Sequence, residues 1–490
     1  MVSFNEMPQN VRVPFVGIEF DNSNASQGPA AQPHTVLIVG QKLAAGTQAE
    51  LVLVPVVNEA DAREKFGAGS MLHHMVKSYR EIDTLSSIKC VAIDDLVAGV
   101  LRIDELTFGA QSITKDGIFS LYIGGAKYQV GVTTAMTNEE LVDACVAAIN
   151  ADDLRVVDAG EGATADILAL TARHKGLVAN NLDIRWNHYD SDVLPTGFVV
   201  PTVAEDTAGA GNPDVQEIVD MLPDEQFNYV VNPYLDATNL AVFRTEAESR
   251  NTALRQIESM FVSASRDSFG NQTTLGESRN DRFLTIMDAL GPDLTYRWAA
   301  SYAARLMQSA QIDPARPFQT LTLSNLVPPK SSETRSFTEK NLLLYSGMSV
   351  AGVSTAGVIS IGRAITTYRL NGQGGTDVSY LDVNTYATLG FIRYDFRNSF
   401  TNKYPRHKLA DDGNVFDSGQ PIMTPKVGRG FAVSKFEGWG GLGLVENIEQ
   451  FISALIVERN SQDVNRLDFQ LAPDIINQMR VAGVKIAFLL

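Results

Sequence analysis

The sequence is poor in the residues that build covalent, redox or metal sites. It contains two cysteines, Cys90 and Cys145, which lie in separate apolar runs without CxxC spacing. We therefore expect free thiols in a reducing compartment and no zinc site. Of the six histidines, His73 and His74 are adjacent and cannot bind one metal as an i, i+4 pair would, so they are predicted to be polar residues at a helix surface or an interface. Neither a metal nor a cofactor is predicted.

The chain is also short of positive charge. It has 40 lysines and arginines against 57 aspartates and glutamates, a net charge of -17. Because phosphate binding needs clustered Lys and Arg, neither nucleic acid nor an anionic membrane surface is expected as a direct partner. No apolar run approaches the ~20 residues that span a bilayer, and residues 1–9 lack the pattern of an export signal. We expect a soluble protein, without membrane insertion, that is made and used inside a cell.

Signatures of catalysis are missing as well. No GxxxxGK[ST] motif occurs, so a P-loop is excluded. The segment GMSVA at 347–351 resembles the serine motif of subtilisins, but the early Asp motif and the His-Gly pair of such a triad are absent. An α/β hydrolase with Ser349 as nucleophile is therefore only a remote alternative, and no catalytic residue is predicted. The segment DDGN at 411–414 lacks the spacing of a calcium loop and is predicted to be a surface turn.

What the sequence does contain is a pattern of alternating strands and helices. Apolar runs at 36–39, 51–57 and 88–93 predict strands, and a helix capped near Ser70 lies between the last two. The pattern resumes after residue 200, with helices at 213–222, 238–251 (capped by Thr238) and 297–307 and a strand at 229–231. This alternation predicts an α/β core, a sheet with helices on its faces.

Residues 97–200 have a different pattern, with several short strands and one helix, which predicts an inserted α+β module. Short strands are expected at 106–108, 118–123, 126–132, 154–157 and 167–171, with a helix at 138–149. Surface loops tolerate such insertions, and we expect the module to face outward. Near the C-terminus, a glycine-rich turn is predicted at 438–443 and an amphipathic helix at 445–460.

Both ends of the chain have apolar alternation that nothing in the sequence would cover. At 11–20 an edge-type strand containing Pro14 is followed by a polar linker to residue 32, and at 484–490 a strand ends the chain. Such strands need a partner, so we expect them to be arms that pair with other subunits. The candidate inter-subunit residues are Val11, Val13, Phe15, Ile18, Phe20, Val484, Ile486, Phe488 and Leu490. The predicted organisation is an N-terminal arm and linker (1–33), a first core part (34–96), the module (97–200), the continued core (201–425) and a C-terminal domain with its arm (426–490).

Several long segments together resemble the tail sheath proteins of contractile-tailed phages, specifically their Mu-like branch. The resemblance rests on the order of these segments and on their coverage of nearly the whole chain. They are HTVLIVGQ (34–41), FGAGSMLHHMVKSY (66–79), LTARHKGLVANNLDIR (170–185), GNPDVQEIVDML (211–222), NYVVNPYLDATNL (228–240), DPARPFQTL (313–321), RAITTYRLNGQGGTDVSYLDVNTYATLGFIRYDFR (363–397), YPRHKLADDG (404–413) and GLVENIEQFISALIVERNSQDVNRLDFQLAPDIINQ (443–478). Sheath cores are often called subtilisin-like for their α/β domain, and the missing triad agrees with a fold resemblance without protease activity.

The resemblance implies a structural subunit, not an enzyme, that polymerises helically around a tail tube and contracts to drive the tube through the host envelope during genome delivery. It implies a subunit assembled in the host bacterial cytoplasm into the virion tail sheath. Its partners would be further copies of itself, the tail tube protein, and the baseplate and tail terminator proteins. Arms would add strands to a neighbour's sheet, and the acidic surface is expected to face basic patches on the tube or on neighbouring subunits. The sheath of a pyocin-like or type VI-like injection particle is an alternative.

Overall fold

The computed structural model describes residues 32–417 and 419–489 of the chain. These residues form two compact units, divided between Tyr386 and Ala387 within helix α9 (Val383–Lys403). We call residues 33–386 the core unit and the described residues from 387 onward the C-terminal unit. None of the helices among the described residues is both long and apolar enough to cross a membrane.

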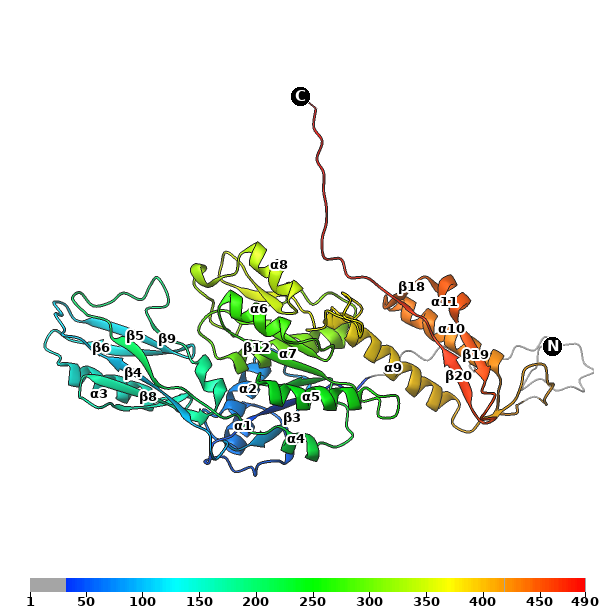
Figure 1. Cartoon of the computed structure of the whole chain (residues 1–490), viewed down its shortest axis with the longest axis horizontal. Helices are drawn as coiled ribbons and strands as arrows, with labels where there is room; N and C mark the ends of the chain where they lie inside the picture. Colours follow the sequence, from blue (N-terminus) through cyan, green and yellow to red (C-terminus); the bar gives the residue numbers. More distant parts are fainter. Residues whose placement is uncertain (1–31, 418, 490) are drawn as a thin grey trace, which may run out of the picture. The chain divides into compact units, whose positions relative to one another are not determined.

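The core unit is built on an eight-stranded sheet of order β15-β14-β13-β12-β11-β1-β3-β2. Figure 1 labels β3 and β12 of this sheet. The six strands from β14 to β3 run parallel, and β15 and β2 pair antiparallel at the two edges. The strands are β1 (Thr35–Gln41), β2 (Leu53–Val56), β3 (Ser87–Ile93), β11 (Tyr229–Val231), β12 (Met260–Ser265), β13 (Leu284–Asp288), β14 (Ser349–Val353) and β15 (Ile359–Arg363). Every residue of β1, β12 and β13 is buried, as expected for parallel strands covered on both faces.

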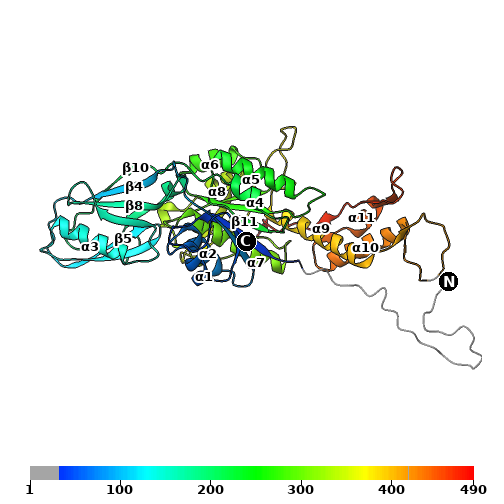
Figure 2. The ribbon, with the colours of Figure 1, turned by 90° about the horizontal axis from the view of Figure 1, so that it is seen from below.

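Helices cover both faces of this sheet, which confirms the predicted α/β class. Figure 2 shows one group, α1 (Glu59–Phe66), α2 (Met71–Arg80) and α7 (Thr295–Ile312), on one side, and a second group, α4 (Gln216–Met221), α5 (Ala237–Arg250) and α6 (Phe269–Glu277), on the other. Helix α8 (Phe337–Tyr345) follows a short 3-10 turn (Ser331–Glu333) and packs against α6. The predicted cap of α2 is confirmed, because Ser70 accepts from the N–H of His73. The predicted cap of α5 is wrong: Asp236, two residues before Thr238, accepts from the N–H of Asn239 at 3.0 Å.

The chain leaves the core sheet after β3 and forms the predicted α+β module. One sheet has the order β10-β4-β8-β7 and the other β6-β5-β9, and α3 packs against β6, β7 and β8. The elements are β4 (Leu101–Thr107), β5 (Gly117–Ile123), β6 (Ala126–Val132), α3 (Asn138–Asn150), β7 (Val157–Glu161), β8 (Ile167–Lys175), a 3-10 turn (Leu177–Asn181), β9 (Ile184–Trp186) and β10 (Thr202–Thr207). The strand expected at 154–157 instead begins at Val157, because the preceding residues form a turn after α3.

The C-terminal unit contains three two-stranded sheets beside its helices. The pairs are β16–β17, β18–β21 and β19–β20. The elements are β16 (Lys408–Leu409), β17 (Ile422–Met423), α10 (Pro425–Gly441), β18 (Val445–Glu446), α11 (Ile448–Ala454), β19 (Ile456–Arg459), β20 (Leu467–Gln470) and β21 (Asp474–Ile475).

Two predictions for this unit are wrong. The helix expected at 445–460 is only α11, because Asn447 adopts a left-handed conformation (φ 60°) before it and Leu455 is extended after it. Residues Ile456–Arg459 then form a ladder with β20, and this pairing with a later segment outweighs the local helical pattern. The glycine-rich turn expected at 438–443 is mostly helix, since α10 continues to Gly441 with Phe436 and Trp439 buried on its inner side.

A buried ion pair and an aromatic cluster hold α9 to α10 within the C-terminal unit. The carboxylate of Asp395 lies 2.6 Å from Nζ of Lys435 and accepts from Nε1 of Trp439 at 2.7 Å. Asp395 is fully buried and Lys435 is nearly so. Around them, aromatic rings from α9, from the residue that follows α9, and from α10 and β20 contact one another in mostly tilted or edge-to-face pairs, which add to simple burial. These rings are Phe396, Phe400, Tyr404, Phe431, Trp439 and Phe469.

Replacing Asp395 by Asn is expected to destabilise the C-terminal unit by about 3 kcal/mol, because Lys435 stays buried without its counter-charge. Hydrogen exchange measured on peptides of α9 and α10 would detect the loss. The matched control is Asp468→Asn, which removes the carboxylate of a pair with Arg466, an arginine whose side chain is 63% exposed. A much smaller change is expected there. Equal effects of the two substitutions would contradict the role given to Asp395.

Candidate functional site

Ser349, the remote nucleophile candidate, is part of the packed interior of the sheet. It is fully buried on β14. Its hydroxyl lies 3.0 Å from Oγ1 of Thr285 and 3.2 Å from the hydroxyl of Tyr302, and it accepts from the N–H of Ile365 at 2.9 Å. These partners fix the hydroxyl between neighbouring strands and helix α7. The arrangement satisfies a buried polar group and presents no nucleophile to a substrate.

His73 and His74 are buried in the core unit, so the prediction that they lie at a surface or interface is corrected. Nδ1 of His73 accepts from the N–H of Gly69 at 3.1 Å, and Nε2 of His74 donates to the carbonyl of Leu154 at 2.9 Å. Burial lowers the pKa of His74 to about 3, so its ring is neutral near pH 7. Cys90 and Cys145 are also buried. Within residues 32–417 and 419–489, no group of three His, Cys, Asp or Glu side chains could hold a metal ion.

In open α/β sheets, ligands bind in the crevice beyond the carboxyl ends of the strands, where the strand order reverses. Here that place lies beyond β1, which has β3 on one side and β11 on the other. The module covers it. Nε2 of Gln41, the last residue of β1, donates to Asp95 at 2.6 Å and to the carbonyl of Lys175 in the module at 2.9 Å. The backbone N–H of Lys175 donates to the same Asp95 carboxylate at 2.9 Å.

His174 completes this network at the end of strand β8. Its Nδ1 lies 3.1 Å from Oδ1 of Asp95, and its Nε2 accepts from the N–H of Met71, the first residue of α2, at 3.0 Å. The ring therefore donates through Nδ1 and satisfies a free N–H of the helix with its other nitrogen. Burial acts to raise the pKa of Asp95, but the hydrogen bonds from His174, Lys175 and Gln41 outweigh it and hold that pKa below its usual range.

Further contacts fix the module to the core. Arg266, just after β12, donates to the carbonyls of Asn181, Gly291 and Asp293. Arg185 lies 2.5 Å from Glu333. The turn between β5 and β6 approaches the core so closely that a Cβ at Gly125, whose φ is 85°, would lie 2.6 Å from Oδ1 of Asp293.

A cavity of about 30 Å³ remains beside His174 and Tyr296. That volume suits a water rather than a substrate.

The predicted C-terminal arm is extended and has no ladder partner among the described strands. Its side chains Val484, Ile486 and Phe488 are 82%, 84% and 76% exposed. Apolar residues at alternate positions share one face of an extended chain, so these three would present one apolar stripe. Leu490 lies outside the described residues, as do the N-terminal candidates Val11, Val13, Phe15, Ile18 and Phe20, and their role stays a prediction.

The structure adds two features that the sequence did not reveal. In the C-terminal unit, the β18–β21 and β19–β20 sheets have two strands each, so every strand has one edge without a partner among the described residues. These edges were hidden by the wrong helix prediction at 445–460.

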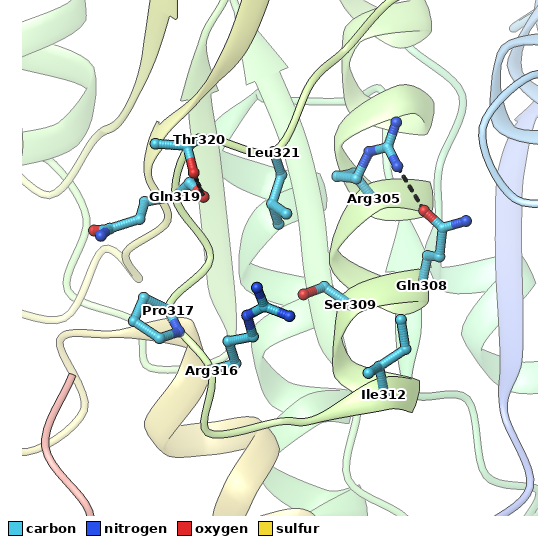
Figure 3. Close-up of a pocket in the computed structure, with 9 residues that line it drawn as sticks. All are labelled: Arg305, Gln308, Ser309, Ile312, Arg316, Pro317, Gln319, Thr320 and Leu321. Carbon is cyan, nitrogen blue, oxygen red and sulfur yellow. Dashed lines mark hydrogen bonds between the residues drawn. The ribbon is translucent and has the colours of Figure 1, made fainter. Parts of the chain in front are cut away.

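In the core unit, a groove of about 450 Å³ lies between the second half of α7 and the segment 316–321 (Figure 3). Part of the lining of this groove belongs to the segment DPARPFQTL (313–321), which was distinguished only by its resemblance to tail sheath proteins. A groove was not predicted there.

Comparison with known proteins gives two family models and a full-length relative. Residues 208–367 match the phage tail sheath protein central domain, and residues 376–488 match the phage tail sheath C-terminal domain. The Mu-like prophage FluMu tail sheath protein of Haemophilus influenzae is 37% identical over 491 residues, with 100% of both chains covered.

Two solved structures align with most of the chain. A chain of the anti-feeding prophage baseplate gives a TM-score of 0.50 at 8% identity, with 98% of this chain and 100% of that chain covered. The sheath tail protein of Desulfitobacterium hafniense gives a TM-score of 0.48 at 12% identity, with 94% of this chain and 100% of that chain covered. At 8% identity, the similarity to the anti-feeding prophage chain supports the fold and nothing about the role of this protein.

A fluorophosphonate probe, which labels activated serine nucleophiles, is expected to leave Ser349 unmodified in the folded protein, because its hydroxyl is buried and bonded to neighbouring strands. Mass spectrometry of the treated protein would check this. Replacing Ser349 by Ala should reduce stability by about 1 kcal/mol by removing its hydrogen bonds. Labelling of Ser349 would revive the hydrolase alternative.

Replacing Asp95 by Asn is expected to destabilise the packing of the module against the core by about 2 kcal/mol, because charge-assisted hydrogen bonds from three donors are lost. Faster hydrogen exchange in residues 71–76 and 172–178 would report it. Asp94→Asn is the matched control, since that neighbouring carboxylate is 53% exposed and forms an ion pair with Lys42. Because the folded pKa of Asp95 is lowered, its stabilisation is present at neutral pH and is lost as the pH falls through about 4 and below. At such acidic pH the stability of the wild-type protein should approach that of the variant. A difference in stability that does not change with pH would contradict this account.

Proposed function

The chain belongs to the phage tail sheath proteins, in their Mu-like branch, and on this premise we propose that it polymerises helically around a tail tube and contracts. Contraction drives the tube through the host envelope during genome delivery. The observation that supports assembly most directly is the stripe of Val484, Ile486 and Phe488, which is exposed among the described residues. An exposed apolar strand is an aggregation liability in a monomer and a means of attachment in a polymer.

The arm binds a neighbouring subunit by adding a strand to its sheet. Main-chain hydrogen bonds then supply the attachment, and the alternate side chains supply the register. The C-terminal unit offers partners for such a strand, because its β18–β21 and β19–β20 sheets have unpaired edges among the described residues. The N-terminal residues Val11 to Phe20 act as a second arm, and both arms keep subunits tethered while the compact units rotate and move outward. In the five-part division predicted from the sequence, these arms belong to residues 1–33 and to the end of residues 426–490.

Contraction requires two packings of the same subunit, of which the extended one is metastable until the baseplate triggers it. New contacts between subunits supply the energy, and no nucleotide takes part. The proposed partners are further copies of this chain, the tail tube protein, and the baseplate and tail terminator proteins. The subunit is assembled in the host bacterial cytoplasm and ends in the virion tail. A pyocin-like or type VI-like particle is the alternative, although type VI sheaths are usually split between two chains and this chain contains both parts.

The protein has a structural role and no catalytic one. Two features of the core unit support this. Ser349 is bonded inside the sheet, and the crevice beyond β1 is occupied by Lys175 and His174 of the module. A fold that elsewhere binds substrates at this crevice is here used as a rigid body.

Removing residues 484–490 is expected to leave a folded protein that no longer forms tubes. Circular dichroism and thermal unfolding would check folding, and negative-stain microscopy would check assembly, with wild-type protein forming long hollow cylinders. Normal tubes from the truncated protein would contradict the arm, and the absence of tubes from wild-type protein would contradict self-assembly itself.

A matched pair of variants separates the two faces of the arm. Ile486→Asp with Phe488→Asp places charges on the apolar stripe and is expected to abolish tubes. Lys485→Asp with Ala487→Asp places the same number of aspartates on the opposite face and should weaken assembly less. Equal defects would mean that the arm does not bind as a strand with one buried face.

A further inference from the structure

The groove of the core unit combines two arginines with apolar walls. Arg305, Ser309 and Ile312 line it from α7, and Arg316 and Leu321 point toward its middle from the opposite segment (Figure 3). Arg305 donates from Nε to the carbonyl of Thr322 at 2.8 Å and from Nη1 to Oε1 of Gln308 at 2.6 Å, both uncharged acceptors. Arg316 is exposed, and its guanidinium has no hydrogen-bond partner in the described part of the chain. No carboxylate lines the groove. The groove is thus a cationic site with an apolar rim.

The segment that forms the far wall is held firmly and under strain. Thr320 has a φ of 59°, an unfavourable conformation for a β-branched residue, and its N–H donates to the carbonyl of Ile361 at 2.7 Å. Phe318 beside it is fully buried, and its N–H donates to Asn384 at 3.2 Å. Strain of this kind persists only where surrounding contacts impose it, and it is common at binding sites. The groove is therefore a preformed feature and not a gap between mobile loops.

The C-terminal unit carries a loop of complementary chemistry. Within residues 411–417 there are three aspartates, and Val415 and Phe416 are 97% and 46% exposed. Asp411 pairs with Arg459 at 3.1 Å, and Asp412 accepts from the N–H of Lys426 at 3.1 Å. The carboxylate of Asp417 has no partner among the described residues. Two exposed apolar side chains thus lie directly beside an unpaired carboxylate.

We propose that the groove binds the loop 411–417 of a second copy of this chain, with Arg316 on Asp417 and with Val415 and Phe416 against Ile312 and Leu321. A guanidinium and a carboxylate form strong, charge-assisted hydrogen bonds. In a protein of net charge -17, a site with two arginines and no acid selects an acidic partner, and every copy presents one. The proposal rests on the assembly function above and names one contact of that assembly.

The contact joins two different surfaces. A groove on one copy and a loop on the next form a head-to-tail interface, which repeats without closing unless the rotation happens to close a ring. This is the type of contact that a helical array requires, and it is separate from the strand exchange of the arms.

Charge reversal tests the pair. Arg316→Asp and Asp417→Arg are each expected to raise the protein concentration needed for tube formation by about tenfold or more. The double variant, which restores opposite charges, should recover most of the loss. Sedimentation of tubes measures the protein concentration needed for tube formation. Circular dichroism checks folding, which substitutions at these exposed positions should not affect. Lys115→Glu, the same kind of reversal at an exposed lysine of the module, is the control and should change little.

Disulfide trapping then shows which copies take part. Cys90 and Cys145 are buried, so Ile312→Cys and Val415→Cys, made in separate chains of different tag, would react with each other and not with native thiols. A mixed disulfide between the two chains is expected under oxidation. Mixing Ile312→Cys with Leu254→Cys, a position 96% exposed on another part of the core unit, should give none.

Three results would overturn the proposal. Normal tubes from both charge reversals, while wild-type protein also forms tubes, would refute this contact and leave the sheath function standing. A disulfide formed only within a chain that contains both Ile312→Cys and Val415→Cys would place the loop on its own groove. Wild-type protein that never forms tubes would refute the sheath function and this contact with it.

Discussion

The carboxylate of Asp95 lies where three parts of the core unit meet. It accepts from Gln41 at the end of β1, from His174 in the module and from the backbone of Lys175. Through His174 it also positions the ring nitrogen that accepts from the first turn of α2. One charge, mostly removed from water, thus fixes the central strand, a flanking helix and the module together. Because each donor is satisfied by this group, its loss would leave several polar atoms without partners at one place.

A comparable constraint holds the C-terminal unit. Asp395 on α9 joins Lys435 and Trp439 on α10, and the aromatic rings around them exclude water. In each unit a carboxylate, half-buried in Asp95 and fully buried in Asp395, therefore fixes the packing of elements that lie far apart in sequence. Such units suit a polymer in which compact parts move while extended segments and surface contacts change partners. The surfaces proposed to contact other subunits are the apolar arm, the open edges of the small sheets and the cationic groove.

Local pattern was sufficient for β1, β2, β3 and β11 of the core sheet, but it did not predict the strands β12 to β15. It was also insufficient for contacts between distant residues. The strands near 36–39, 88–93 and 229–231 were predictable because parallel strands covered on both faces are continuous apolar runs. Helix α2 was predictable from Ser70 and the apolar face that follows it. The helix expected at 445–460 was wrong because the ladder of β19 with β20 and the left-handed Asn447 depend on residues outside the pattern. The network of Asp95 joins residues 54 and 79 positions apart, and no local rule brings these together.

Several of the hydrogen bonds that attach the module to the core have a backbone carbonyl as the acceptor. Those of Leu154, Lys175 and Asn181 accept from His74, Gln41 and Arg266 of the core, and Arg173 and His188 of the module donate to the carbonyls of Ala68 and Pro328. A carbonyl is present whatever the side chain. The residues that supply these acceptors are therefore free to be replaced during evolution while the attachment persists. The module can acquire a new outer surface by mutation without being released from the core.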